Sequence, residues 1–144
     1  MYTGLLHAHH WLRYIALILL AISLVKAIMD RKKKDEEAGN LKTELYTMIS
    51  FHLQLLIGMM LLFLSPKVKT SMEDMGAAMG DSAQRLLLVE HPLMMIIALI
   101  LITIGYAKLK GKKDKASYSK TVLIYYGIAG ILVLSRIPTY SWTF

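Results

Sequence analysis

The sequence predicts an all-α membrane protein: a four-transmembrane-helix bundle, up-down-up-down, forming a single domain over residues 1–144. Apolar residues make up 56% of a chain that nevertheless carries a net charge of +7, which is unusual for a soluble domain of this length. Four stretches are also long enough to cross a hydrocarbon core of about 30 Å, which takes about 20 residues of helix. These spans are expected at about 8–29, 44–65, 83–109 and 118–137.

The first span is expected to remain in the mature chain. No short basic leader precedes its apolar run, and no small-residue cleavage pattern follows it at Val25 to Asp30. The connections between spans are short, so consecutive helices should be antiparallel neighbours. Because the chain has no cysteine, a metal site would have to use histidine, methionine or carboxylate ligands.

Lysine and arginine concentrate in two of the three connections, "DRKKKDEEAGNLK" at 30–42 and "KLKGKKDKASYSK" at 108–120. The positive-inside rule places both in the cytoplasm, so both termini are expected on the outer (periplasmic) side. We attribute the basic residues to orientation and to contact with anionic lipid, and we expect no nucleic-acid partner. An interfacial aromatic belt is expected at the outer ends of the helices; it consists of Trp11, Tyr14, Tyr140, Trp142 and Phe144.

The middle connection mixes acidic and basic residues and contains "SMEDMGAAM" at 71–79. Ser71, followed three residues later by Asp74, predicts the start of a short helix. Met72, Met75 and Met79 would share one face of that helix. A short interfacial helix over 71–79 is therefore expected to lie flat on the outer surface.

Ionisable residues inside a span are costly and mark candidate sites. Here they are His7, His9, His10, Arg13, His52, Glu90, His91 and Arg136. With a rise of about 1.5 Å per residue, His91 lies about 9 Å below the outer boundary, close in depth to the first-span histidines. His52 lies about 20 Å deep, so it is not expected to join them unless its helix tilts or rises.

Helical spacing divides the first-span histidines between two faces. Residues three or four apart share a face, so His7 lies with His10, whereas His9 lies with Arg13. At most one of these faces points into the bundle. If His10 faces inward, His7 follows it and His9 turns sideways or towards the lipid headgroups.

Two histidines on different helices are what a b-type haem requires, because neutral imidazoles can fill both axial positions of the iron. The propionates would need cations, and Arg13 and Arg136 are expected near the same outer surface. Glu90 would orient His91, carry protons, or form an ion pair with Arg13 or Arg136. The expected lining is small or flexible: Gly58, Met59, Met94, Met95 and Ala98.

Nearly the whole chain resembles a family of small bacterial four-span membrane proteins commonly labelled "cytochrome B". The likeness rests on "LLHAHHWLRY" at 5–14, "TMISFHLQLLIGMMLLFLSP" at 47–66, "DMGAAMGDSAQRLLLVEHPLMMIIALILITIG" at 74–105 and "SRIPTYSW" at 135–142. In that family the positions of His7, His9, His52, Glu90 and His91 bear the same residues. The position of His10 is usually not histidine, which shifts the ligand expectation to His7 with His91, and then to His9.

The resemblance implies a multi-pass protein of the bacterial inner membrane that binds haem b and transfers electrons between membrane quinol and a redox partner protein. No histidine lies in the fourth span, where similar haem bundles often use one, so two haems are not expected. His52 is then an alternative ligand, a quinone or proton-relay residue, or simply a hydrogen-bonding residue between helices.

Two other functions fit the same residues. A copper or other transition-metal protein would use His7, His9, His10 and His91, with a methionine relay of Met72, Met75, Met79, Met94 and Met95. A non-catalytic accessory subunit would pack against a larger membrane complex through Gly58, Gly105, Gly127 and Gly130. Nucleophilic hydrolysis is not supported, because cysteine is absent and no serine, histidine and carboxylate constellation is evident.

Overall fold

The computed structural model describes residues 1–138, and every regular element in this part of the chain is helical. The elements are α1 (Tyr2–Asp30), α2 (Lys42–Leu64), α3 (Pro66–Glu73), α4 (Met75–Gly80), α5 (Ser82–Arg85), the π-helical turn η1 (Leu86–Glu90), α6 (His91–Leu109) and α7 (Lys115–Ser135). Within residues 1–138, four helical stretches are long and apolar enough to cross a membrane: Tyr2–Asp30, Lys42–Leu64, Ser82–Leu109 and Lys115–Ser135. The predicted all-helical fold with four candidate spans is confirmed.

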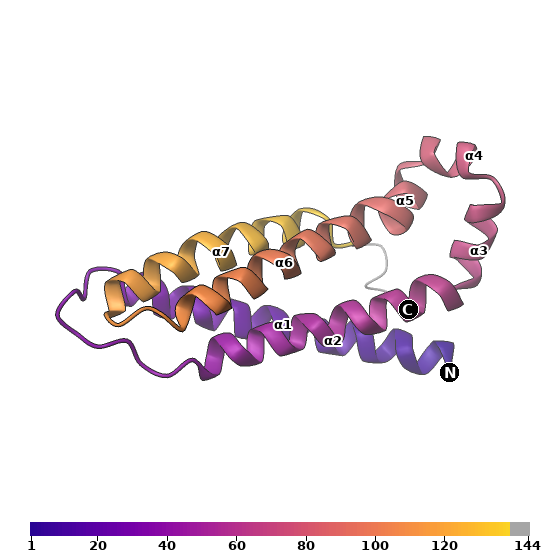
Figure 1. Ribbon diagram of the computed structural model, residues 1–144. Coiled ribbons are helices and arrows are strands. Elements are labelled where there is room, and N and C mark those ends of the chain that lie inside the picture. The colour runs from indigo at the N-terminus through magenta and orange to yellow at the C-terminus, as the bar shows by residue number, and fades with distance from the viewer. Residues whose placement is uncertain (139–144) are drawn as a thin grey trace.

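The four long helices form one elongated bundle (Figure 1). α1 packs against α2 and α7, and α6 packs against the same two helices, so each long helix has two neighbours. α1 begins and α7 ends at the same end of the bundle, where α3 and α4 also lie. We call this the histidine end, because it carries His9, His10 and His91; the opposite, basic end carries the connections 31–41 and 110–114.

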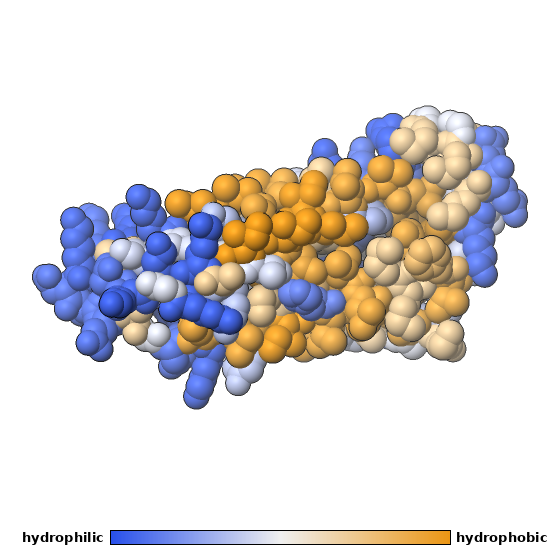
Figure 2. All heavy atoms as spheres, viewed as in Figure 1, coloured by the Kyte–Doolittle hydropathy of each residue, from blue (hydrophilic) through white to orange (hydrophobic). Residues whose placement is uncertain are grey.

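Small side chains allow the helices to approach closely along the bundle core. Ala16, Ala98 and Ala129 are buried on α1, α6 and α7, and they pack with larger buried residues such as Ile102 and Tyr126. On the face shown in Figure 2, apolar residues cover the middle of the bundle and hydrophilic residues gather at its two ends. This distribution is compatible with lipid contact around the middle of the bundle.

The connection between α2 and α5 is divided differently from the expected helix 71–79. α3 begins at Pro66, where the Ser65 side chain accepts a hydrogen bond from the Val68 backbone N–H at 3.5 Å. Asp74 ends α3 and caps α4 by accepting a hydrogen bond from the Ala77 N–H at 3.1 Å. Because the Asp74 side chain starts a new helix, the exposed methionines at 72, 75 and 79 lie on two short helices instead of one face.

A short backbone contact joins the two connections at the basic end. The Ala38 N–H donates to the Lys113 carbonyl at 2.7 Å, and the Lys115 N–H donates to the Glu36 carbonyl at 2.9 Å. The Lys115 ammonium also lies 2.7 Å from the Glu36 carboxylate. The two lysine-rich connections, which are far apart in the sequence, therefore form one surface.

Candidate cofactor site

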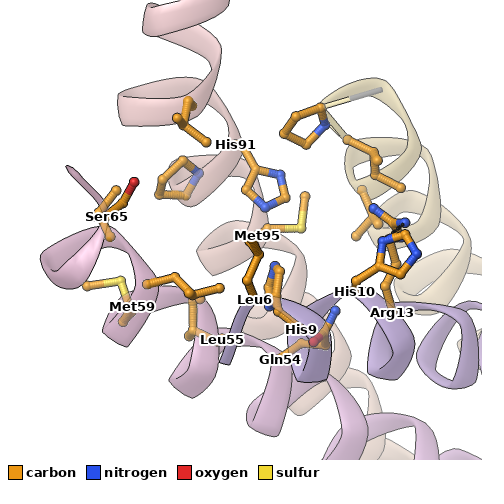
Figure 3. Close-up of a pocket in the computed structure, with 18 of the residues that line it drawn as sticks. Leu6, His9, His10, Arg13, Gln54, Leu55, Met59, Ser65, His91 and Met95 are labelled. Carbon is orange, nitrogen blue, oxygen red and sulfur yellow. Dashed lines mark hydrogen bonds between the residues drawn. The ribbon is translucent and has the colours of Figure 1, made fainter. Parts of the chain in front are cut away.

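A cavity of about 260 Å³ lies at the histidine end of the bundle. Its walls come mainly from α1, α2 and α6, and Figure 3 shows the side chains that surround it. Most of the lining is aliphatic or thioether, including Leu6, Leu55, Met59 and Met95. The polar lining side chains are Tyr2, His9, His10, Arg13, Gln54, Ser65, Lys67 and His91. The cavity thus combines an apolar wall with a few convergent nitrogen and oxygen groups, as is typical of a cofactor site.

His91 stands at the start of α6, directly after the π-helical turn η1 and before Pro92. A π-helical turn inside a longer helix changes which side the following residues face, and such turns are frequent at functional sites. The His91 Nδ1–H donates to the backbone carbonyl of Arg136 at 2.8 Å. Because a carbonyl can only accept, Nδ1 carries a proton, and in the neutral imidazole the lone pair is on Nε2.

His9 projects from α1 towards His91 across the cavity (Figure 3). Its Nδ1 is buried and makes no hydrogen bond within the described part of the chain. The ring also lies close to α2, because a Cβ at Gly58 would be only 3.2 Å from His9 Cε1. Glycine at this position therefore gives the imidazole the room it occupies.

The two imidazole rings have the spacing of a ligand pair. Their centroids are 6.4 Å apart and their planes meet at 89°. When two imidazoles bind one ion from opposite sides, two metal–nitrogen bonds of about 2.0 Å and two ring radii of about 1.1 Å separate the centroids by about 6.2 Å. The spacing therefore fits two imidazoles that would share one metal centre.

His7 and His52 both lie outside this cavity. His7 is exposed on α1, and the structure brings His9, not His7, to His91. Leu6, His9, Arg13 and Ala16 line the cavity at spacings of three and four, and His10 from the neighbouring face of α1 lines it as well, so the expectation that only one of the two faces points inward is wrong. His52 is exposed on α2, and its Nδ1–H donates to the Met48 carbonyl of the same helix at 2.8 Å.

The arginines near the site have different surroundings. Arg13 lines the cavity, and its guanidinium lies 2.9 Å from His10 Nδ1. Arg136 lies outside the cavity lining, and its Nε is 3.7 Å from Glu90 Oε2. Arg13 and Arg136 were the two ion-pair partners expected for Glu90, and the structure pairs it with Arg136. It adds Arg85, whose Nε donates to Glu90 Oε1 at 3.1 Å.

The remaining expected lining and ligand residues are divided between the cavity and the surface. Gly58, Met59 and Met95 line the cavity, whereas Met94 and Ala98 do not. Within residues 1–138, no group of three or more histidine or carboxylate residues is arranged to hold a metal ion. The expected belt residues Tyr140, Trp142 and Phe144 lie outside the described residues, while Trp11 and Tyr14 are exposed on α1.

Two polar features were not anticipated from the sequence. Gln54 lines the cavity with its Oε1 buried and without a hydrogen-bond partner in residues 1–138. Near the basic end, the fully buried Glu44 lies 3.1 Å from the Lys26 ammonium and accepts a hydrogen bond from the Tyr118 hydroxyl at 2.7 Å. The useful signal was the spacing of Glu44, Thr47, Phe51, Gln54 and Gly58 along one face of α2.

Comparisons with known proteins give no relative: no family model matches the chain, and no curated protein or solved structure is significantly similar to it.

Proposed function

We propose that the chain is a small integral membrane b-type cytochrome that binds one haem between His9 and His91 and passes electrons to or from membrane quinol. The observation that carries this proposal is the His9 and His91 ring pair, with centroids 6.4 Å apart in a largely apolar cavity. Haem, when bound, supplies one-electron redox chemistry. The bacterial inner membrane, with both termini on the outer side, belongs to the same proposal, supported by the four spans and the two basic connections.

The proposed function gives parts to the two histidines, to Arg13 and to the two methionines of the cavity. His91 would bind through Nε2, because its Nδ1 proton is committed to the Arg136 carbonyl. His9 would be the second ligand, and Arg13, which lines the cavity, would contact a propionate. The volume of about 260 Å³ lies just below the range of ligand pockets, about 300–1,000 Å³. The flexible Met59 and Met95 side chains are therefore expected to move when the macrocycle binds.

His52 suits the lipid-soluble partner better than it suits the metal. Its Nδ1 proton is held by Met48, so Nε2 is an exposed acceptor on the outer surface of α2. A membrane quinol carries hydroxyl donors and reaches the protein through the lipid. We therefore assign His52 to quinol contact. His52→Ala should raise the KM for quinol and leave the haem spectrum unchanged.

An optical spectrum tests the haem proposal. The full chain, expressed in haem-replete cells and purified in detergent, should show sharp b-type bands after reduction with dithionite. His9→Ala and His91→Ala should each abolish these bands, whereas the matched controls His7→Ala and His52→Ala should retain them. A colourless wild-type protein would reject the proposal, and loss of the bands only in His7→Ala would transfer the ligand role to His7.

A copper protein is the second candidate, because the thioethers of Met59 and Met95 line the same cavity as the two histidines. Imidazole and thioether donors together suit Cu(I). Metal analysis of the washed protein separates the two candidates: copper without haem supports this function, and haem iron without copper supports the first.

A further inference from the structure

Three charged side chains meet where the α5–η1–α6 stretch passes the end of α7. Glu90 Oε1 accepts a hydrogen bond from Arg85 Nε at 3.1 Å, and Glu90 Oε2 lies 3.7 Å from Arg136 Nε. All three side chains are partly exposed, between 32% and 44%. Solvent-exposed ion pairs contribute little to stability on their own, so the cluster is better explained by what it holds in place.

Arg136 connects this cluster to the cavity through its backbone. α7 ends at Ser135, and Arg136 is its C-cap, so the Arg136 carbonyl has no following helical N–H to accept from. The His91 Nδ1–H fills that position at 2.8 Å. The same residue therefore contacts Glu90 with its guanidinium and His91 with its carbonyl.

Glu90 does not need to touch His91 to influence it. The two residues are neighbours in sequence at the junction of η1 and α6, and consecutive helical residues point in directions about 100° apart. Glu90 faces Arg85 and Arg136, whereas His91 lines the cavity. The connection between them passes through the end of α7.

We propose that Glu90 is a positioning residue for His91. Its carboxylate holds Arg136 at the end of α7, so that the Arg136 carbonyl keeps the proton on His91 Nδ1 and leaves Nε2 free to face the cavity. Histidine ligands commonly depend on such a hydrogen bond for their tautomer and ring orientation, and losing it typically costs about 10-fold to 100-fold in metal affinity. The ligand role of His91 rests on the proposed function, whereas its tautomer rests only on the hydrogen bond to the Arg136 carbonyl.

The test compares five variants of the full chain in detergent: Glu90→Gln, Glu90→Asp, Arg136→Gln, Arg85→Gln and the double variant of Glu90→Gln with Arg136→Gln. Imidazole ¹⁵N NMR of haem-free protein, with His91 assigned by His91→Ala, reports which ring nitrogen carries the proton. Haem retention, measured by transfer to an excess of an apo-haem acceptor protein, reports ligand strength independently of any activity.

We expect Glu90→Gln and Arg136→Gln each to mix the two His91 tautomers and to weaken haem retention about 10-fold or more, and the double variant to be no worse than either. Glu90→Asp should restore much of the wild-type behaviour. Arg85→Gln is the matched control, because it breaks the other ion pair of Glu90 and should leave the His91 signals as in the wild type.

Two results would overturn the proposal. One is a single Nδ1–H tautomer of His91 with wild-type haem retention in Glu90→Gln. The other is an equal effect of Arg85→Gln and Glu90→Gln, which would mean that Glu90 acts on His91 through the π-helical turn η1 and not through Arg136. If the wild-type chain binds no haem but the tautomer follows Glu90 as expected, the proposed function fails while the positioning role stands.

Discussion

The imidazoles of His9 and His91 meet at 89° across the cavity, with ring centroids 6.4 Å apart and no hydrogen bond between them. His91 presents the lone pair of Nε2, and Nδ1 of His9 is buried without a partner in the described chain. Buried polar nitrogens are costly when nothing compensates for their lost hydration. A metal centre that accepts both lone pairs would remove that cost, which links the unsatisfied geometry to the proposed cofactor.

Gly58→Ala should impair the site without removing any ligand. The new Cβ would lie 3.2 Å from His9 Cε1, which is tighter than most Cβ contacts, so the ring would have to move by a few tenths of an ångström. We therefore expect the His9 ring to shift and haem retention to fall about 10-fold or more, as for other losses of ligand orientation. The measurement is the haem content per protein and the rate of haem transfer to an acceptor.

Gly4→Ala is the control for this change, because nothing lies within 4 Å of the Cβ position of Gly4 on α1. Wild-type haem binding by Gly58→Ala would show that His9 does not need its present position, and it would weaken the assignment of His9 as a ligand.

Tyr118→Phe should destabilise the bundle. The Tyr118 hydroxyl donates at 2.7 Å to Glu44 Oε2, and Glu44 is fully buried between α1, α2 and α7. Removing a hydrogen bond to a buried charged group costs about 1.5–3 kcal/mol. Reversible unfolding in mixed micelles should show a lower free energy of unfolding by that amount.

Tyr46→Phe is the matched control, since Tyr46 is 53% exposed on α2. Tyr126→Phe should have a smaller effect, because the Tyr126 hydroxyl donates to the uncharged backbone carbonyl of Glu44 at 3.0 Å. A hydrogen bond between uncharged groups contributes about 0.5–1.5 kcal/mol. Equal stability of Tyr118→Phe and the wild type would mean that Lys26 alone satisfies the buried carboxylate.

The helices could be predicted from sequence because hydrophobic length determines them. The runs that become the four candidate spans are at least about as long as a bilayer span, and tertiary contacts need only extend or shorten their ends. The connection at 71–79 was harder, because Ser71 and Asp74 both have capping side chains. The structure uses Asp74, together with Ser65 six residues before Ser71.

The site was harder to predict than the fold because it depends on rotation about the helix axes. Spacing showed that His9 and His7 lie on different faces of α1, but not which face turns inward. The π-helical turn before His91 also alters the register of α6, and apolar periodicity does not reveal it. Depth did not decide the position of His52: its neighbour Phe51 lines the cavity, so His52 lies outside because it is exposed on the outer face of α2.

Gly105→Ala should disrupt the contact between α6 and α7. The new Cβ would lie 2.6 Å from Tyr125 Cβ, an atom fixed to the α7 backbone that cannot rotate away. The two helices would have to separate, and overpacking of this kind typically costs about 1–3 kcal/mol. Unfolding in mixed micelles gives the measurement.

Gly127→Ala is the control on α7, where the nearest atom to the new Cβ would be Leu24 Cδ2 at 4.0 Å. This variant should unfold like the wild type. An unchanged free energy of unfolding for Gly105→Ala would show that α6 and α7 are less tightly packed than the structure indicates.

The contact between the two basic connections should weaken in acid. The hydrogen bond from the Lys115 ammonium holds the pKa of Glu36 below its usual 4.5. A carboxyl whose pKa is lowered by folding contributes stability above its ordinary pKa and loses it as the pH falls through the lowered value. The contact should therefore be complete at neutral pH and weaken progressively below about pH 4.5.

Hydrogen-exchange protection factors of the Ala38 and Lys115 amides report this contact, because both donate across the two connections. Asp114 also has a lowered pKa, since it accepts a hydrogen bond from the Ser117 N–H at the start of α7. The Glu36→Gln variant separates the effects of Glu36 and Asp114. It should lower the protection of the two amides at neutral pH and remove the part of the acid dependence that comes from Glu36. The part that comes from the capping hydrogen bond of Asp114 should remain. Unchanged protection in Glu36→Gln at every pH would assign the contact to its backbone hydrogen bonds alone.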